Sequence, residues 1–323
     1  MTKIVGGEDD VLDDGALFFM QPEPTIFLRD RYMEPPFTVL DRRTGSWQAR
    51  DRQWKALGIQ SELGRDVRLL TTGGLQGDGA TFTSETSIFS PALAELMYRW
   101  YSRPGATVLD PFAGGSVRGI VAAHLGRRYI GLELSGAQVM ANRAQLPMAP
   151  PEGAPIWVHA DSRITLADWA QGEHAETMDM ILSCPPYAHL EKYSDDPADI
   201  SNMPYPKFLE AYRDIIRDAA AMLAPDRFAV WVIGEVREKG GDGSCLGVIA
   251  DTVNAFRDAG MELYNDHVML TPIGTAPQRA PKQFDAARKA GRVHEYVLVF
   301  VKGDARKASQ WLGNVQDKAI EED

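Results

Sequence analysis

The sequence predicts an α/β fold, in which helices cover both faces of a doubly wound, mostly parallel sheet of seven strands. Short apolar runs alternate with stretches of helical periodicity over most of the chain after residue 90. Two of these runs stop abruptly, at Asp110-Pro111 and at Cys184-Pro185, in residues that do not continue a strand. Such a change is typical of a buried parallel strand that delivers a functional loop at its carboxyl end.

Most of the expected strands are short apolar runs that end at polar residues, glycine or proline. The first expected helix begins at Ser90-Pro91, because serine is a good N-cap and proline suits the first helical position. Further helices are expected over 117–125, 138–144, 205–223 and 246–259. The seven strands are expected over 107–110, 129–134, 156–159, 178–183, 228–234, 263–270 and 296–302.

The length and composition are those of an ordinary globular protein. A chain of 323 residues can bury a complete α/β core and one small attachment, and its hydrophobic fraction of 44% is typical. We find no apolar run long enough to cross a bilayer and no signal-peptide region at the start. The two cysteines, Cys184 and Cys245, lack metal-ligand spacing, so we expect no metal, no membrane association and a cytoplasmic location.

The charge distribution divides the chain into four predicted parts. Residues 1–28 hold one lysine and six acidic residues and are expected to form a flexible arm. Residues 29–80 combine many arginines with two tryptophans and are expected to form a basic, aromatic attachment for target recognition. Residues 81–303 hold the α/β domain, and 304–323 a C-terminal tail. The net charge of −11 weakens a nucleic-acid interpretation, because phosphate contacts favour basic surfaces.

The loop Asp110–Ser116 has the features of a cofactor-binding loop. It links a strand to a helix N-terminus, its glycines allow close backbone approach, and the helix end favours an anionic group. Glu133 ends the next strand, where an acidic residue commonly holds ribose hydroxyls. Asp161 ends the third strand and can accept a hydrogen bond from an adenine amine. A dinucleotide site, or a glycine turn that only packs, is the alternative.

The second loop, Cys184-Pro185-Pro186-Tyr187, has features suited to a nucleobase. An exocyclic amine is a poor nucleophile, because its lone pair is delocalised into the ring. Proline fixes the backbone, so the loop presents rigid carbonyl acceptors for the amine protons, and Tyr187 can stack on a base rotated out of a duplex. Sulfur is a weak acceptor, so the carbonyls of Cys184 or Pro185, and Ser183, are expected to carry more of the binding. Alternatively, Cys184 is simply a small buried residue.

Together the two loops resemble the cofactor loop and catalytic loop of amino-group DNA methyltransferases, which methylate cytosine N4 or adenine N6 with S-adenosylmethionine. The family's first loop usually reads Asp-Pro-Phe-x-Gly-Ser-Gly-Thr, whereas Gly115 and Ser116 are interchanged here. Its second loop begins with Asp or Ser, and Cys184 stands there instead; the size of cysteine matches serine and slightly favours cytosine N4. The order Cys-Pro, rather than Pro-Cys, argues against a C5-cytosine enzyme.

The resemblance implies a Rossmann-like S-adenosylmethionine-dependent methyltransferase fold and a compact plan similar to phage or prophage modification enzymes. It also implies the roles of individual residues. The cofactor residues are Ser87, Phe89, Asp110, Pro111, Phe112, Ala113, Gly114, Gly115, Ser116, Glu133, Leu134, Asp161 and Ser162. The catalytic residues are Ser183, Cys184, Pro185, Pro186 and Tyr187.

Two basic segments are candidates for DNA contact. The segment 271–292, expected to be a loop, carries five basic residues against one acidic residue, and the segment 29–68 interleaves arginines with tryptophans. The candidate residues are Arg279, Lys282, Arg288, Lys289 and Arg292, with Arg42, Arg43 and Arg50. We expect double-stranded DNA as the partner of a monomer or homodimer. RNA or a small molecule as substrate, or a non-catalytic nucleic-acid-binding protein on the same fold, are the alternatives.

Overall fold

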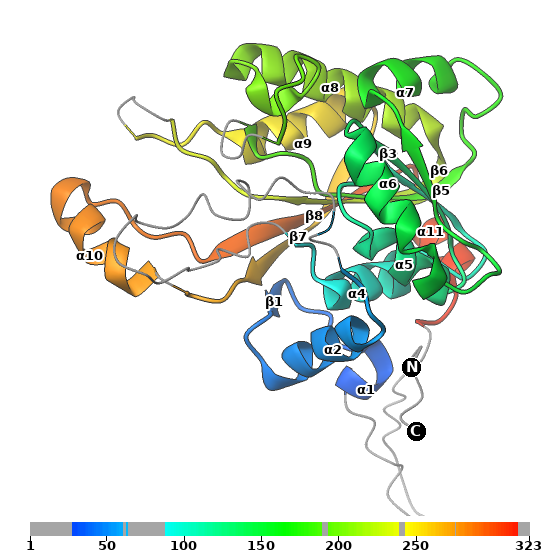
Figure 1. Cartoon of the computed structure of the whole chain (residues 1–323), viewed down its shortest axis with the longest axis horizontal. Coiled ribbons are helices and arrows are strands. Elements are labelled where there is room, and N and C mark those ends of the chain that lie inside the picture. Colours follow the sequence, from blue (N-terminus) through cyan, green and yellow to red (C-terminus); the bar gives the residue numbers. More distant parts are fainter. Residues whose placement is uncertain are drawn as a thin grey trace, which may run out of the picture.

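The computed structural model describes residues 28–60, 63, 88–188, 193–238, 243–274 and 276–315. Within these residues eight strands form one sheet, in the order β1-β7-β8-β6-β5-β2-β3-β4 (Figure 1). The strands are β1 (Val39–Asp41), β2 (Thr107–Asp110), β3 (Arg128–Glu133), β4 (Ile156–His159), β5 (Met178–Ser183), β6 (Leu223–Ile233), β7 (Glu262–Leu270) and β8 (His294–Lys302).

The mixed, mostly parallel sheet confirms the predicted fold class. Five of the seven strand pairs in the described part of the chain are parallel, and only the pairs of β8 with β6 and β7 are antiparallel. The expectation of seven strands was wrong by one, because β1 adds a short edge strand beside β7. Only Leu40 is buried in β1, and three residues are too few to show a periodicity.

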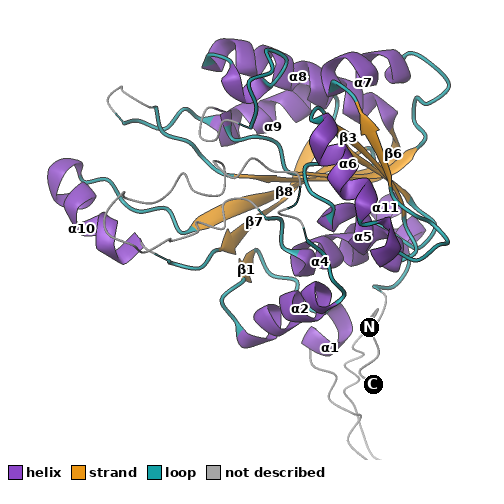
Figure 2. Ribbon diagram, in the orientation of Figure 1, coloured by secondary structure: helices purple, strands orange, loops and turns teal. Residues whose placement is uncertain are grey.

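Helices cover both faces of the sheet (Figure 2). One face packs against α4 (Pro91–Tyr101) and α5 (Val117–His124), and the other against α8 (Tyr205–Met222) and α9 (Val248–Asp258). The remaining helices are α1 (Leu28–Tyr32), α2 (Gly45–Ala56), α6 (Gly136–Ala144), α7 (Ser162–Ala170), α10 (Ala276–Ala287) and α11 (Ala305–Leu312), with 3-10 turns at Leu146–Met148 and Ile200–Asn202. The hydroxyl oxygen of Ser90 accepts a hydrogen bond from the backbone N–H of Leu93, as expected for the N-cap of α4.

Strand residues alternate between the two cores, as the pleat of a sheet requires. In β6, Val230 and Val232 pack on the side of α4 and α5, whereas Trp231 and Ile233 pack on the side of α8 and α9. Both sets are fully or almost fully buried. The sheet therefore forms the rigid base from which the loops at its carboxyl edge are presented.

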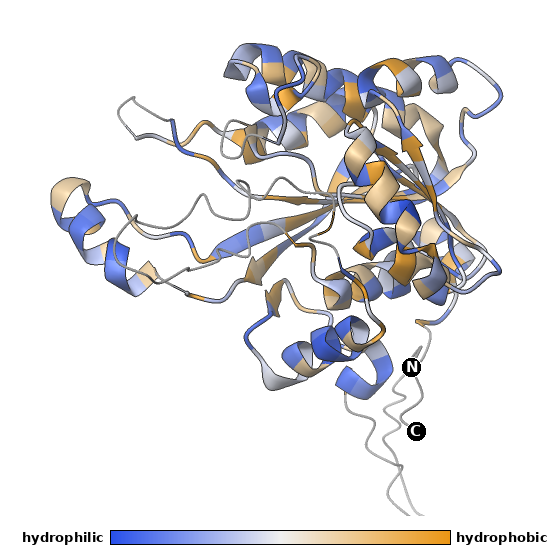
Figure 3. Ribbon diagram, viewed as in Figure 1, coloured by the Kyte–Doolittle hydropathy of each residue, from blue (hydrophilic) through white to orange (hydrophobic). Residues whose placement is uncertain are grey.

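The helix α10 differs from the rest of the molecule. It projects away from the sheet, is hydrophilic over much of its length, and has no buried residue (Figure 3). The expectation of a loop over 271–292 was therefore wrong for residues 276–287. No helix in the described ranges is long and apolar enough to cross a membrane.

Candidate active site

A cavity of about 1100 Å³ opens at the carboxyl edge of the sheet and is lined by the loops that follow β2 and β5. These strands are neighbours, but the chain continues from β2 to β3 and β4 on one side and from β5 to β6 on the other. The connections therefore diverge at this point. Open α/β sheets bind ligands at such a switch point.

Most of the predicted cofactor residues line this cavity. Those that do are Phe89, Pro111, Phe112, Gly114, Gly115, Glu133, Leu134, Asp161 and Ser162. Asp110, Ala113 and Ser116 are buried and do not line it. Ser87 lies outside the described residues. The predicted set thus separates into residues that face the cavity and residues that support its wall.

Asp110 is the centre of a buried hydrogen-bond network beneath the first loop. One carboxylate oxygen accepts from the Ser183 hydroxyl at 2.6 Å and from the backbone N–H of Phe112 at 3.1 Å. The other accepts from Arg118 Nε at 2.5 Å and from the Tyr129 hydroxyl at 2.7 Å. Hydrogen bonds from this many charged and polar donors offset the desolvation cost of burying the carboxylate. Asp110 therefore holds the loop in place rather than facing a ligand.

Ser183 connects the first loop to the second. Its hydroxyl donates to Asp110 and accepts from the backbone N–H of Phe112 at 3.2 Å, and its side chain is fully buried. Ser183 was expected to help bind a base, but it does not line the cavity. The sequence separation of Asp110 and Ser183 hides this contact from periodicity and spacing.

Glu133 lies on the cavity wall and supports the glycines of the first loop. Its carboxylate accepts from the backbone N–H of Gly114 at 2.9 Å and from that of Ser135 at 2.7 Å. Burial raises the pKa of Glu133, whereas these two backbone hydrogen bonds oppose the rise. Gly114 has a left-handed φ of 51°, which a glycine adopts without strain. Its carbonyl accepts from the Asn142 amide at 2.7 Å, so the loop is fixed on both sides.

Phe89 reaches the cavity from the segment that precedes α4. The guanidinium of Arg118 lies 4.6 Å from the centroid of the Phe89 ring, within cation–π range. The same guanidinium donates to the backbone carbonyls of Phe112 and Ala113 at 2.6 and 3.0 Å. Arg118, which the sequence did not single out, therefore joins the segment before α4 to the cofactor loop.

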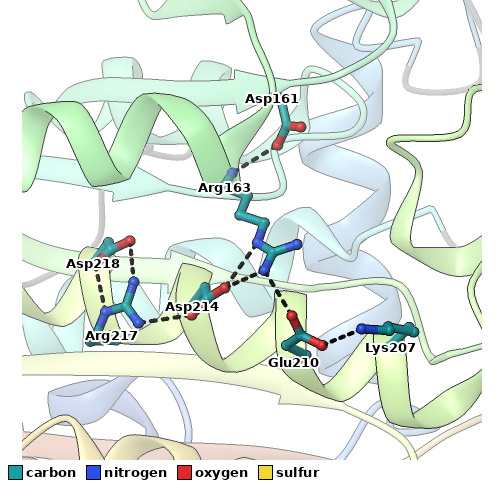
Figure 4. Close-up of polar contacts among 7 residues, drawn as sticks. All are labelled: Asp161, Arg163, Lys207, Glu210, Asp214, Arg217 and Asp218. Carbon is teal, nitrogen blue, oxygen red and sulfur yellow. Dashed lines mark hydrogen bonds and ion pairs between the residues drawn. The ribbon is translucent and has the colours of Figure 1, made fainter.

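Asp161 caps the helix that follows β4. Its carboxylate accepts from the backbone N–H of Arg163 at 2.8 Å, while its side chain also lines the cavity. Figure 4 shows that the Arg163 guanidinium turns away to α8, where it contacts Asp214 at 2.6 Å and Glu210 at 3.4 Å. These ion pairs tie α7 to α8. Asp161 itself remains at the cavity wall.

The second loop lines the cavity with Cys184, Pro185, Pro186 and Tyr187. The Tyr187 ring rests on Gly234, where an added Cβ would lie only 3.1 Å from ring carbon Cε2. The Cys184 sulfur and the Tyr187 hydroxyl are 3.6 Å apart. Burial raises the pKa of the Cys184 thiol to about 12, so this sulfur is a neutral thiol at neutral pH.

The predicted DNA-contacting residues fall into three groups. Arg42, Arg279 and Arg292 line the rim of the cavity. Arg43 is exposed but paired with Asp41 at 2.8 Å, and Arg50 is bonded to the buried carboxylate of Glu95. Lys282, Arg288 and Lys289 lie on or after α10, outside the cavity.

The described residues contain no group of three or more His, Cys, Asp or Glu side chains that could hold a metal ion.

One family model matches part of this chain. Residues 41–141 match the family described as DNA methylase. A segment of 52 residues is 42% identical to the type II methyltransferase M.SmaI of Serratia marcescens, and it covers 16% of this chain and 18% of that protein.

Two solved structures are similar to part of this chain. TrmN from Thermus thermophilus is 20% identical, with a TM-score of 0.44, and the match covers 68% of this chain and 51% of that chain. The magnesium protoporphyrin IX methyltransferase of Synechocystis PCC 6803, solved with bound SAM, is 15% identical, with a TM-score of 0.39 over 62% of this chain and 71% of that chain.

Proposed function

We propose that this chain, whose residues 41–141 match the DNA methylase family, transfers a methyl group from S-adenosylmethionine to an exocyclic amine of a DNA base. The observation that carries the proposal is a single cavity lined by both predicted loops. Pockets for one small ligand usually measure about 300–1,000 Å³. A cavity of about 1100 Å³ can therefore hold a cofactor and a base together.

The donor and acceptor groups on the cofactor side fit this cofactor. Glu133 presents a carboxylate that can accept from ribose hydroxyls, and Asp161 presents one that can accept from an adenine amine. Gly114 and Gly115 allow the methionyl part to approach the backbone at the start of α5. When bound, S-adenosylmethionine supplies an electrophilic methyl group on a sulfonium sulfur.

On the catalytic side, this chain's residues bind and orient the base. Tyr187 offers its ring for stacking, and its support on Gly234 keeps the ring in one position. Pro185 and Pro186 hold the backbone of the loop, so its carbonyl groups can accept from the amine. The size of Cys184 slightly favours cytosine N4 over adenine N6 as the target.

The rim of the cavity supports contact with a DNA backbone. Arg42, Arg279 and Arg292 bring positive charge to the opening, although the whole chain carries a net charge of −11. The similarity of a short segment to M.SmaI supports a role in restriction-modification. With such a role, we expect the protein in the cytoplasm of a bacterial or phage-infected cell.

The test is mass spectrometry of nucleosides from the DNA of an expressing strain, with a strain producing Tyr187→Ala at the same level as the matched control. New N4-methylcytosine or N6-methyladenine with the wild type alone would support the proposal and identify the methylated base. Binding of S-adenosylmethionine by calorimetry without any DNA methylation would overturn it. RNA or a small molecule would then become the expected substrate, as the acidic net charge favours.

A further inference from the structure

The exocyclic amine of a bound base needs a strong hydrogen-bond acceptor. Its nitrogen becomes nucleophilic when an acceptor draws one amine proton out of the plane of the ring. The first position of the second loop does not supply this acceptor well, because Cys184 is a neutral thiol and sulfur accepts weakly. A carboxylate elsewhere on the cavity wall is better suited to this task.

Glu295 lies at the right place in the sheet. It is the second residue of β8, and it pairs with Met269 of β7. The β6–β8 register pairs Ile233 with Tyr296, so one further step places Glu295 opposite Gly234. Gly234 is the residue on which the Tyr187 ring rests. Glu295 is half-buried and lines the same cavity as Tyr187.

The alternation of β8 places Glu295 on the same face as Cys184. Val297, Val299 and Val301 follow Glu295 at every second position and pack in the core beside α4 and α5. Cys184 packs against that same core. Burial is the main cause of the raised pKa values of Cys184 and Tyr187, and the charge of Glu295 raises both further. All three groups therefore share one electrostatic environment.

The other carboxylates of the cavity lie at different places in the fold. Glu133 and Asp161 stand on the cofactor side and accept from the backbone. Asp51 accepts from the Ser90 hydroxyl and from the backbone N–H of Ala92, at the start of α4. Asp199 accepts from Ser194 and Ser201, within its own turn. Among these carboxylates, Glu295 is the one set in the sheet beside the support of Tyr187.

We propose that Glu295 accepts a hydrogen bond from the exocyclic amine of the target base and takes up its proton during methyl transfer. This inference rests on the proposed function. In the step, the amine lone pair forms the N–C bond to the methyl carbon while the C–S bond breaks and its electron pair returns to sulfur. The amine proton moves to the Glu295 carboxylate and from there to solvent. A weak acceptor at Cys184 is then sufficient.

The test compares Glu295→Gln and Glu295→Asp with wild type, using S-[methyl-³H]adenosylmethionine and unmethylated genomic DNA. Glu262→Gln, at the exposed start of β7, is the matched control. We expect kcat of Glu295→Gln to fall about 100-fold, with unchanged affinity for S-adenosylmethionine, because general bases contribute about 10²–10⁴-fold. We expect Glu295→Asp to recover part of the loss.

A pH profile separates this role from a purely structural one. The wild-type kcat should fall toward acidic pH as the carboxylate is protonated, and this limb should be absent in Glu295→Gln and retained in Glu295→Asp. If wild type methylates DNA and Glu295→Gln matches Glu262→Gln in kcat and pH profile, the role of Glu295 is overturned while the proposed function stands. If wild type methylates no DNA, the proposed function fails, and this inference fails with it.

Discussion

The floor of the cavity and the projecting segment 271–292 were both predicted to hold ligand-contacting residues, yet they are built in opposite ways. In the floor, Asp110, Arg118 and Ser183 are buried and bonded to one another. In the projecting segment α10 has no buried residue, and Asp285 and Arg288 stand 3.8 Å apart with both side chains exposed. Polar groups in the floor are occupied by the protein itself, whereas those of the segment are open to solvent or to phosphates.

The difference shows which residues of a predicted site hold a loop in place and which remain available to a partner. A polar residue that ends a buried strand has donors from neighbouring strands within reach, so it is used to hold the loop. A charged residue on an exposed helix has few such neighbours, and its charge remains available to a partner. Substitutions in the floor should therefore change stability, and substitutions on the projecting segment should change binding.

The largest effect is expected for Asp110→Ala. The change removes the partner of a buried guanidinium and of two buried hydroxyls, and breaking a buried ion pair costs about 3–5 kcal/mol. We expect the thermal midpoint to fall by about 10 °C, or the soluble protein to be lost. Ser183→Ala should cost about 1–2 kcal/mol, and the exposed Asp258→Ala is the control. An unchanged midpoint for Asp110→Ala would mean that Asp110 does not hold the floor.

The next effect concerns the alkylation rates of the two cysteines, one on the cavity wall and the other on the exposed surface. The pKa of Cys184 is raised by burial to about 12, so about one thiol in 10,000 is ionised at pH 8. Cys245 is exposed. We expect iodoacetamide at pH 8 to label Cys184 at least about 100-fold more slowly than Cys245, as measured by peptide mass spectrometry.

The labelling rate of Cys184 should rise about tenfold per pH unit below its pKa, because the thiolate is the reactive form. Equal rates in the unfolded protein provide the control. Comparable labelling of both cysteines in the folded protein would contradict a half-buried, neutral Cys184.

A smaller effect on stability is expected for Arg50→Ala, which tests a residue first expected to contact DNA. Arg50 donates to the fully buried carboxylate of Glu95, which also accepts from Trp54 at 2.6 Å and from Arg99 at 2.9 Å. Because two donors remain, we expect a loss of about 2 kcal/mol in the free energy of unfolding rather than the full cost of an unpaired charge. Urea denaturation measures this, with Arg52→Ala on the exposed side of α2 as control.

DNA affinity per folded molecule should be unchanged in Arg50→Ala. A clear fall in DNA affinity without a loss of stability would mean that Arg50 contacts DNA, as first predicted.

The smallest effect is expected for Arg279→Ala and Arg292→Ala at the rim. Each should weaken DNA binding several-fold and reduce the slope of log K against log salt by about one, if each contacts one phosphate. Thermal stability should not change, since both side chains are exposed. Fluorescence anisotropy with a labelled duplex at several salt concentrations measures the slope. Slopes equal to that of wild type would place the DNA elsewhere.

The sequence predicted the strands well and the loops in part. Seven expected strands were found, because each contains a short apolar run, whereas β1 has only three residues. The helix α10 was missed because Pro277 and Pro281 suggested a loop, although one proline lies near the helix start and the helix accommodates the other.

The site was predicted as a set of residues but not as a set of roles. Spacing along the chain identified Glu133, Tyr187 and the glycines, since each lies at the end of a strand or in the loop after it. It could not identify the partner of Arg50, which is 45 positions away on another helix, nor the contact between Asp110 and Ser183, which are 73 positions apart. Side-chain pairing of this kind depends on packing, which a single sequence does not reveal.

The position of the Ser183 hydroxyl between the two loops has a consequence for how ligands bind in the cavity. It is bonded to Asp110 and to the backbone of Phe112, so a displacement of either loop disturbs the same atom. A ligand that orders the first loop also restricts the second loop through this hydroxyl. The second loop then loses less conformational entropy when it binds its own ligand. Linkage requires the effect to be mutual, so each occupant of the cavity should raise the affinity for the other by the same factor. We therefore expect the two halves of the cavity to bind their occupants cooperatively through this one oxygen atom.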